Sequence, residues 1–143
     1  MINTKLPYDN ELECSVLGAV IQENDTYNEV AKYFNDDDVF SSKTNKTLWN
    51  KISTLKRDKK KYDLVSICSS LTLEEKKSGL NSFYITGCTT NACLKSTAEY
   101  HASQVYENYL LRKVIVMVAD IKQKAEGNYR DVYETIADAH SLF

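Results

Sequence analysis

Proline and glycine are scarce in this chain, which has one proline and four glycines among 143 residues. Both residues interrupt helices, and both are common in the tight turns that connect β-strands. Their scarcity argues against a turn-rich β architecture, while lysine, glutamate, leucine, asparagine and alanine are plentiful. The predicted fold class is therefore all-α.

The chain also lacks a strong net charge, since its formal charge is −2 at pH 7 and its pI is about 5.7. Domains that bind a nucleic-acid backbone usually carry a clustered basic excess. The one basic run is 56–61, which we interpret as solvated cations closing a helix. A DNA contact is the alternative, although no aromatic residues are interleaved with these cations to stack bases.

Long hydrophobic runs are missing as well. No apolar stretch approaches the roughly 20 residues of a membrane span, and the N-terminus has no charged-then-apolar signal pattern. We expect a soluble, cytoplasmic protein with no membrane partner.

Residues for catalysis are equally few, because His101 and His140 are the only histidines. Both fall in segments with helical periodicity, and neither accompanies a nucleophile motif or a plausible metal cluster. The phosphate-binding loop G-x4-G-K-[ST] does not occur. We predict no catalytic residue, no cofactor site, no metal site and no ATPase activity in this chain.

Four cysteines and one acidic run invite a metal interpretation that we do not favour. Cys14 and Cys68 lie in apolar helical patterns, and Cys88 and Cys93 lack the C-x2-C spacing of a zinc site, so we expect free thiols. The acidic run 36–38 lacks the alternating ligands and glycine of a Ca²⁺ loop. We expect a solvated turn or a helix cap there.

The first predicted helix spans 11–21 and turns abruptly apolar after a polar start. Asp9 or Asn10 can cap it, and Asn10 with Glu13 has the spacing of a capping box. Gly18 in mid-helix costs about 1 kcal/mol relative to alanine, which indicates that another backbone packs closely there. The predicted structural core comprises Leu17, Gly18, Trp49, Ile52 and Leu55.

Short helices follow in the middle of the chain. We predict helices over 25–34 and 43–59, a short helix capped by Asp63, and a capping box of Thr72 and Glu75 ended by Gly79. The segment 82–85 should bury Phe83 or Tyr84, and 89–95 should be a loop.

A much longer helix is predicted after this loop. Ser96 and Glu99 have capping-box spacing, and no breaker precedes Gly127, so the helix would be about 45 Å long. A final helix over 129–143 would pair with it in a hairpin. We divide the chain into a globular helical bundle (1–95) and the hairpin (96–143).

Apolar residues of the long helix exceed one face, so the hairpin should leave an apolar strip that marks a dimer interface. The alternative is that the N-terminal helices fold back and cover the strip. The predicted interface residues are Val105, Tyr109, Leu110, Val114, Met117, Ile121, Val132 and Ile136.

Several segments in order resemble one family, the N-terminal domain of DnaB-type replicative DNA helicases. After Pro7 the chain reads E-x-E-x-S-V-L-G, then N-K-x-L-W at 45–49, Y-D-L-V-S-I at 62–67 and F-Y-I at 83–85. The long helix reads E-Y-H-A-x-x-V-x-E-x4-R-K-x-I over 99–115. The family usually has histidine where this chain has Asn45, and paired glycines where it has Leu80 and Asn81.

The resemblance implies the collar of a hexameric helicase ring, a trimer of dimers built through the hairpin, with a docking surface for primase and in some systems for a helicase loader. ATP, Mg²⁺ and single-stranded DNA would be handled by a RecA-like ATPase domain, absent from this chain, in a parent helicase that unwinds duplex DNA. We expect a fragment ending near a domain boundary. A stand-alone nucleic-acid-binding or helicase-regulating module is the alternative.

Overall fold

The computed structural model describes residues 6–127, 136–137 and 140–141 of the chain. Within these residues the regular structure is entirely helical, with no strand, which confirms the all-α prediction. The elements are α1 (Asn10–Gln22), α2 (Thr26–Ala31), the 3-10 helix η1 (Asp37–Val39), α3 (Lys43–Arg57), α4 (Leu64–Ser69), α5 (Leu73–Lys77), α6 (Ser82–Thr90) and α7 (Lys95–Gly127).

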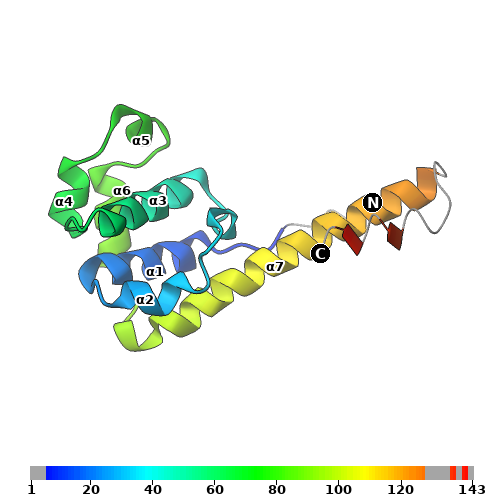
Figure 1. Cartoon of the computed structure of the whole chain (residues 1–143), viewed down its shortest axis with the longest axis horizontal. Coiled ribbons are helices and arrows are strands. Elements are labelled where there is room, and N and C mark those ends of the chain that lie inside the picture. The colour runs from blue at the N-terminus through cyan, green and yellow to red at the C-terminus, as the bar shows by residue number, and fades with distance from the viewer. Residues whose placement is uncertain (1–5, 128–135, 138–139, 142–143) are drawn as a thin grey trace. The chain divides into compact units, whose positions relative to one another are not determined.

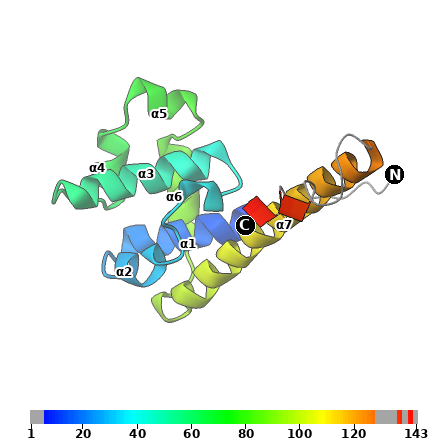
Figure 2. The same cartoon turned by 45° about the vertical axis from the view of Figure 1, so that its right-hand side comes forward.

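The contacts divide the chain into a unit over Tyr8–Tyr109 and a second unit that contains Leu110–Phe143. In the first unit, α1 is the central helix, because it packs against α2, α3 and α6. Figure 1 and Figure 2 both show α1 between α3 and the first half of α7. The division of the chain at 95/96 remains a prediction.

The predicted capping box requires Asn10 to be the N-cap of α1, but Asn10 is already the first residue of the helix. Asp9 is the N-cap, and its Oδ1 accepts the Leu12 amide at 3.0 Å. The Glu13 carboxylate does not accept the backbone amide of the N-cap residue. It is buried and accepts the Ser41 amide instead. The Asn10–Glu13 capping box is therefore wrong, since a tertiary partner competes successfully for the Glu13 side chain.

Gly18 of α1 lies directly against the backbone of α6 at Cys88. A Cβ built on this residue would sit 2.0 Å from the Cys88 carbonyl oxygen and 3.1 Å from the Cβ of Ala92. No side chain fits at such distances, so the absence of a Cβ permits the close contact between the two helices.

The core is centred on Trp49 of α3. Its ring stacks on Tyr27 at a centroid distance of 4.9 Å and meets Phe34 edge-on at 5.1 Å. The indole Nε1 donates to the Phe34 carbonyl at 3.2 Å, so its polar edge is satisfied inside the core. Leu17, Ile52 and Leu55 are buried around it.

The short helices α4, α5 and α6 follow their sequence signals at their starts. Asp63 caps α4 by accepting the Ser66 amide, and Thr72 with Glu75 forms the predicted capping box of α5, which is confirmed. Gly79 ends that turn at a φ of 95°, in the left-handed region that glycine tolerates.

Helix α6 is longer than the predicted segment 82–85. It extends to Thr90, so the expected loop 89–95 is shortened to the four residues 91–94 between α6 and α7. Ile85 is buried and Tyr84 half-buried, whereas Phe83 is 90% exposed. Of the two alternatives for this segment, Tyr84 is the aromatic residue that turns inward.

Helix α7 begins at Lys95, ahead of the predicted Ser96–Glu99 capping box, which is not formed. Glu99 instead pairs with Lys32, and Lys95 pairs with Asp25 at the N-cap of α2. The Lys95 hydrogen bond lowers the pKa of Asp25. Both pairs are solvent-exposed and contribute little stability, so the burial of Ala98 and Ala102 holds this part of α7 in the core. The predicted helix 129–143 lies mostly outside the described residues.

The structure corrects the expectation that all four cysteines are free thiols. Cys14 of α1 and Cys88 of α6 form a disulfide, with Cα atoms 4.9 Å apart, while Cys68 and Cys93 are free. The pair is separated by 74 residues, so no local spacing signals it. The same close approach of α1 and α6 that requires Gly18 brings the two sulfurs together.

Candidate protein-interaction surface

The second half of α7 carries apolar side chains that remain exposed. Leu110, Leu111, Val114 and Val118 are between 41% and 54% exposed. At 100° per residue, these four residues fall on one side of the helix. We call them the α7 strip. A strip of this kind on an exposed helix is typical of a protein-protein contact.

The predicted interface residues occupy three different environments. Val105 is 1% exposed and belongs to the core of the first unit, so this structure places it against the chain's own residues. Tyr109 is half-buried, and its hydroxyl donates to the Asp36 carboxylate at 3.2 Å. Met117 is buried and Ile121 half-buried.

The other two predicted interface residues belong to the predicted final helix, 129–143. Ile136 is 59% exposed, and Val132 lies outside the described residues. The alternative that N-terminal helices cover the long helix holds for Ala98, Ala102 and Val105. It does not hold for the α7 strip, whose residues remain exposed.

A buried polar network fixes the start of α3 against α1 and α6. The Asn45 amide is fully buried and donates to Asn10 Oδ1 and to Glu13 Oε1, each at 2.9 Å. Its own oxygen accepts the Tyr84 hydroxyl. Burial raises the pKa of Tyr84, and the Glu13 carboxylate raises it further, so the phenol keeps the proton that it donates. The network positions these helices and leaves no free donor on Asn45.

A half-buried ion pair connects α3 to the cap of α5. Lys51 Nζ lies 3.1 Å from Glu75 Oε1, with each side chain less than a fifth exposed. Burial would raise the pKa of Glu75, but hydrogen bonds from the Thr72 amide and from Lys51 outweigh it, so the net pKa lies below the ordinary value. Glu75 therefore stays ionised at neutral pH and orients α5.

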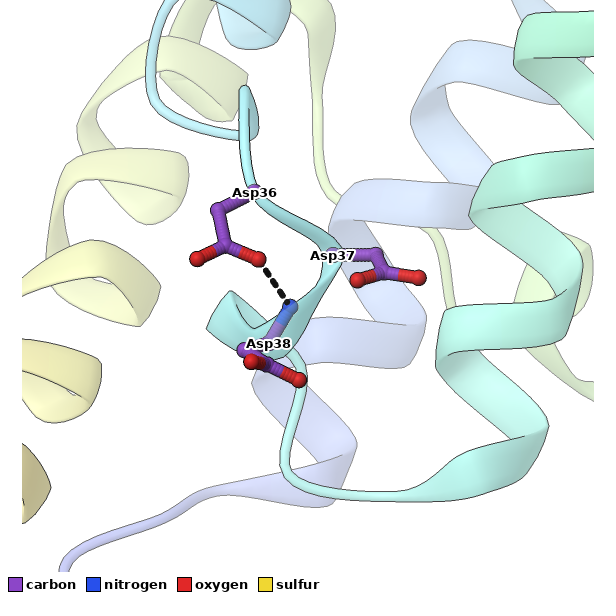
Figure 3. Close-up of side chains that lie close together, drawn as sticks. All are labelled: Asp36, Asp37 and Asp38. Carbon is purple, nitrogen blue, oxygen red and sulfur yellow. Dashed lines mark hydrogen bonds between the residues drawn. The ribbon is translucent and has the colours of Figure 1, made fainter.

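The acidic run Asp36–Asp38 forms a cap, as Figure 3 shows. Asp36 Oδ1 accepts the Asp38 amide at 3.0 Å and caps η1. Asp37 accepts Asn50 Nδ2 at 2.9 Å, and Asp38 pairs with Lys46 at 3.0 Å. The carboxylate oxygens lie within 4.8 Å of one another, yet these side chains already have protein partners. A helix cap is the interpretation that these contacts support.

The basic run closes α3. Lys56 and Arg57 occupy its last turn, and the Lys60 amide reaches back to the Leu55 carbonyl at 2.8 Å. Lys59 takes a left-handed φ of 58°, the conformation in which many helices end. Lys56 Nζ lies 4.7 Å from the centre of the Tyr27 ring. These contacts are those of a helix terminus with solvated cations.

A family comparison decides the identity of the fold. The model of the DnaB-like helicase N terminal domain matches residues 5–107. The chain belongs to this family. Among curated proteins, none matches the chain. The family assignment confirms the resemblance drawn from the motifs of α1, α3, α4, α6 and α7.

Solved structures support the same fold. The crystal structure of the N-terminal domain of DnaB helicase from Mycobacterium tuberculosis is similar, with a TM-score of 0.85 at 21% identity over 96% of this chain and 98% of that one. A structure of a DnaB-like replicative helicase and its interactions with primase has a TM-score of 0.73 at 18% identity. This chain covers 94% of its own length there but 32% of the helicase chain.

Sequence reasoning on this DnaB-like N-terminal domain missed the features that depend on α6. The disulfide between Cys14 and Cys88 follows from the orientation of a short helix with no clear periodicity. The sequence did give one signal, a second helical glycine at Gly87. None of the helices in the described part of the chain is long and apolar enough to cross a membrane.

Proposed function

We propose that this chain is the collar domain of a replicative DNA helicase, and that it joins subunits through α7. Dimers would form through the helical hairpin and assemble as a trimer of dimers in the hexamer. Membership of the DnaB-like N-terminal family supports the collar role. The α7 strip carries the proposal, because its exposed apolar residues lie on one side of a long helix.

The partners of the parent protein form the second part of the proposal. The collar would dock primase, and in some systems a helicase loader. A similar solved structure described as a DnaB-like replicative helicase and its interactions with primase supports the first of these partners. ATP, Mg²⁺ and single-stranded DNA would belong to a RecA-like motor domain. On this proposal, the chain alone hydrolyses no ATP.

Sedimentation equilibrium tests the dimer. The wild-type chain should show a concentration-dependent dimer mass, and Val114→Glu should weaken dimerisation at least about a hundredfold, because it buries an unpaired carboxylate in an apolar contact. Val114 is already partly exposed, so the variant should keep the fold of the chain, which circular dichroism would verify.

Gln123→Glu is the matched control for this experiment. Gln123 is an exposed residue on the opposite side of α7, and the substitution adds the same charge. It should leave the dimer constant unchanged. A monomer mass at every concentration of wild-type protein would contradict the proposal, and so would equal effects of the two substitutions.

A further inference from the structure

A groove of about 620 Å³ lies between the first turns of α1 and the outer face of α6. No residue of the α7 strip lines it, and its lining belongs entirely to the unit Tyr8–Tyr109. Leu12 and the two sulfur-bearing residues Cys14 and Cys88 line it, so part of the lining is apolar.

Gly87 lines this groove, and no packing contact in the described part of the chain requires a glycine there. Glycine inside a helix is destabilising relative to alanine, and Gly87 lies inside α6. A Cβ built on Gly87 would meet no atom within 4 Å, whereas one built on Gly18 would collide with the Cys88 carbonyl. Gly18 is thus required by internal packing, and Gly87 is not. A glycine of this kind fits the close approach of a backbone from outside the chain.

Phe83 strengthens this interpretation. It is 90% exposed and precedes Gly87 by four residues, so both residues lie on one face of α6. Asn91, the C-cap of α6, continues this line, and its side-chain amide donates to the Gly87 carbonyl at 2.9 Å. All three line the groove. A partner at this face would meet the aromatic ring of Phe83, the bare backbone of Gly87 and the amide of Asn91 in succession. Aromatic anchors of this kind dominate the energy of protein contacts.

The acidic residues at the groove indicate the charge of the partner that it would bind. Asp9 and Glu11 are exposed acidic residues on its α1 side, and the described residues that line it include no lysine, arginine or histidine. A complementary partner would present cations to these carboxylates and apolar side chains to Leu12 and Phe83. That combination on one backbone is a basic amphipathic helix, which binds grooves through residues spaced by three and four.

We propose that the α1–α6 groove binds a basic amphipathic helix of a partner protein, with a small residue of that helix crossing α6 at Gly87. Its lining shares no residue with the α7 strip. If the proposed collar function holds, the groove is a second interaction surface in addition to that strip.

The test uses a displayed library of helical peptides of about 16 residues, long enough to form helix, selected on the full chain with its disulfide intact. The peptides carry leucines at helical spacing, alanine at the central position and lysines elsewhere. A second library replaces lysine by glutamate. Lysine peptides should be enriched, and they should shift the amide resonances of Leu12, Phe83 and Gly87 in ¹⁵N spectra.

Gly87→Ala supplies the decisive variant. It should raise the melting temperature by about 3 °C, because it removes a helical glycine, and weaken the selected peptide about tenfold, because the new methyl blocks the approach. Thr86→Ala is the control, since Thr86 is exposed on the same helix and lies outside the groove. It should leave peptide affinity unchanged.

Several results would overturn the proposal. These are enrichment of glutamate peptides as strong as that of lysine peptides, failure to enrich either, and shifts that map away from α1 and α6. A lower melting temperature for Gly87→Ala would show that the glycine serves the fold. Concentration-dependent shifts at Gly87 without peptide would make the groove a contact between copies of the chain.

Discussion

At the scale of single residues, Asn45 shows how a buried amide can have all of its hydrogen-bonding groups paired. The asparagine amide donates to the Glu13 carboxylate at 2.9 Å. Its second proton and its oxygen are also used, by Asn10 and Tyr84. A buried amide with every group paired avoids the desolvation cost of an orphaned polar atom.

Gly18 gives the residue-scale prediction. Gly18→Ala should lower the free energy of unfolding by about 2 kcal/mol or more, because the clash with the Cys88 backbone outweighs the gain in helix propensity. Urea denaturation followed by circular dichroism measures the change. Gly87→Ala is the matched control, the same substitution in open space, and should raise stability by about 1 kcal/mol. Equal effects of the two substitutions would contradict the packing role of Gly18.

At the scale of elements, the short helix α5 depends on its cap, since its described residues include none that is buried. Thr72 and Glu75 satisfy each other's backbone donors, and Lys51 ties Glu75 to α3. A five-residue helix cannot persist on intrinsic propensity, so these contacts and the turn at Gly79 hold it in place.

The element-scale prediction concerns the pH dependence of this connection. The pKa of folded Glu75 lies below its ordinary value of 4.5. The stabilisation is therefore complete above about pH 4.5 and is lost as the pH falls through the folded pKa. Glu75→Gln, which keeps the cap acceptor but loses the charge, should cost about 1 kcal/mol at pH 7. The difference from wild type should shrink in acid, as measured by urea denaturation across pH.

Glu126→Gln is the control for Glu75. Its partner Lys122 lies 3.8 Å away and both side chains are about two-thirds exposed, so the substitution should change stability little at any pH. A Glu75→Gln effect that persists unchanged in acid would show that the charge is not the cause.

Elements with strong local signals were predictable from the sequence, and those positioned by tertiary contacts were not. Thr72–Glu75 and Asp63 cap their helices as predicted, because each cap bonds within its own turn. The other two predicted capping boxes fail because Glu13 and Glu99 find distant partners in Ser41 and Lys32. The α7 strip was visible as surplus apolar residues. The α1–α6 groove could not be predicted from the sequence, because it depends on the orientation of α6.

At the scale of the whole molecule, the disulfide closes a long covalent loop within the first unit. Cys14 and Cys88 are 74 residues apart, and the loop between them contains α2 through α5. Joining the first core helix to α6 restricts the unfolded chain far more than the folded one. The disulfide therefore acts on the stability of the entire first unit.

The molecular-scale prediction is a count of thiols and a stability difference. Unfolded without reductant, the chain should react with iodoacetamide at two cysteines, Cys68 and Cys93, and after reduction at four. Reduction, or Cys14→Ala, should lower the free energy of unfolding by about 4 kcal/mol, because a loop of this length removes that much chain entropy from the unfolded state. Mass spectrometry and urea denaturation measure the two quantities.

The control is Cys68→Ala, whose free energy of unfolding should fall on reduction as much as that of the wild type, because its disulfide stays intact. Four reactive thiols in the unreduced chain would contradict the pairing, and the first unit would then be stabilised by its non-covalent core without a covalent link between α1 and α6.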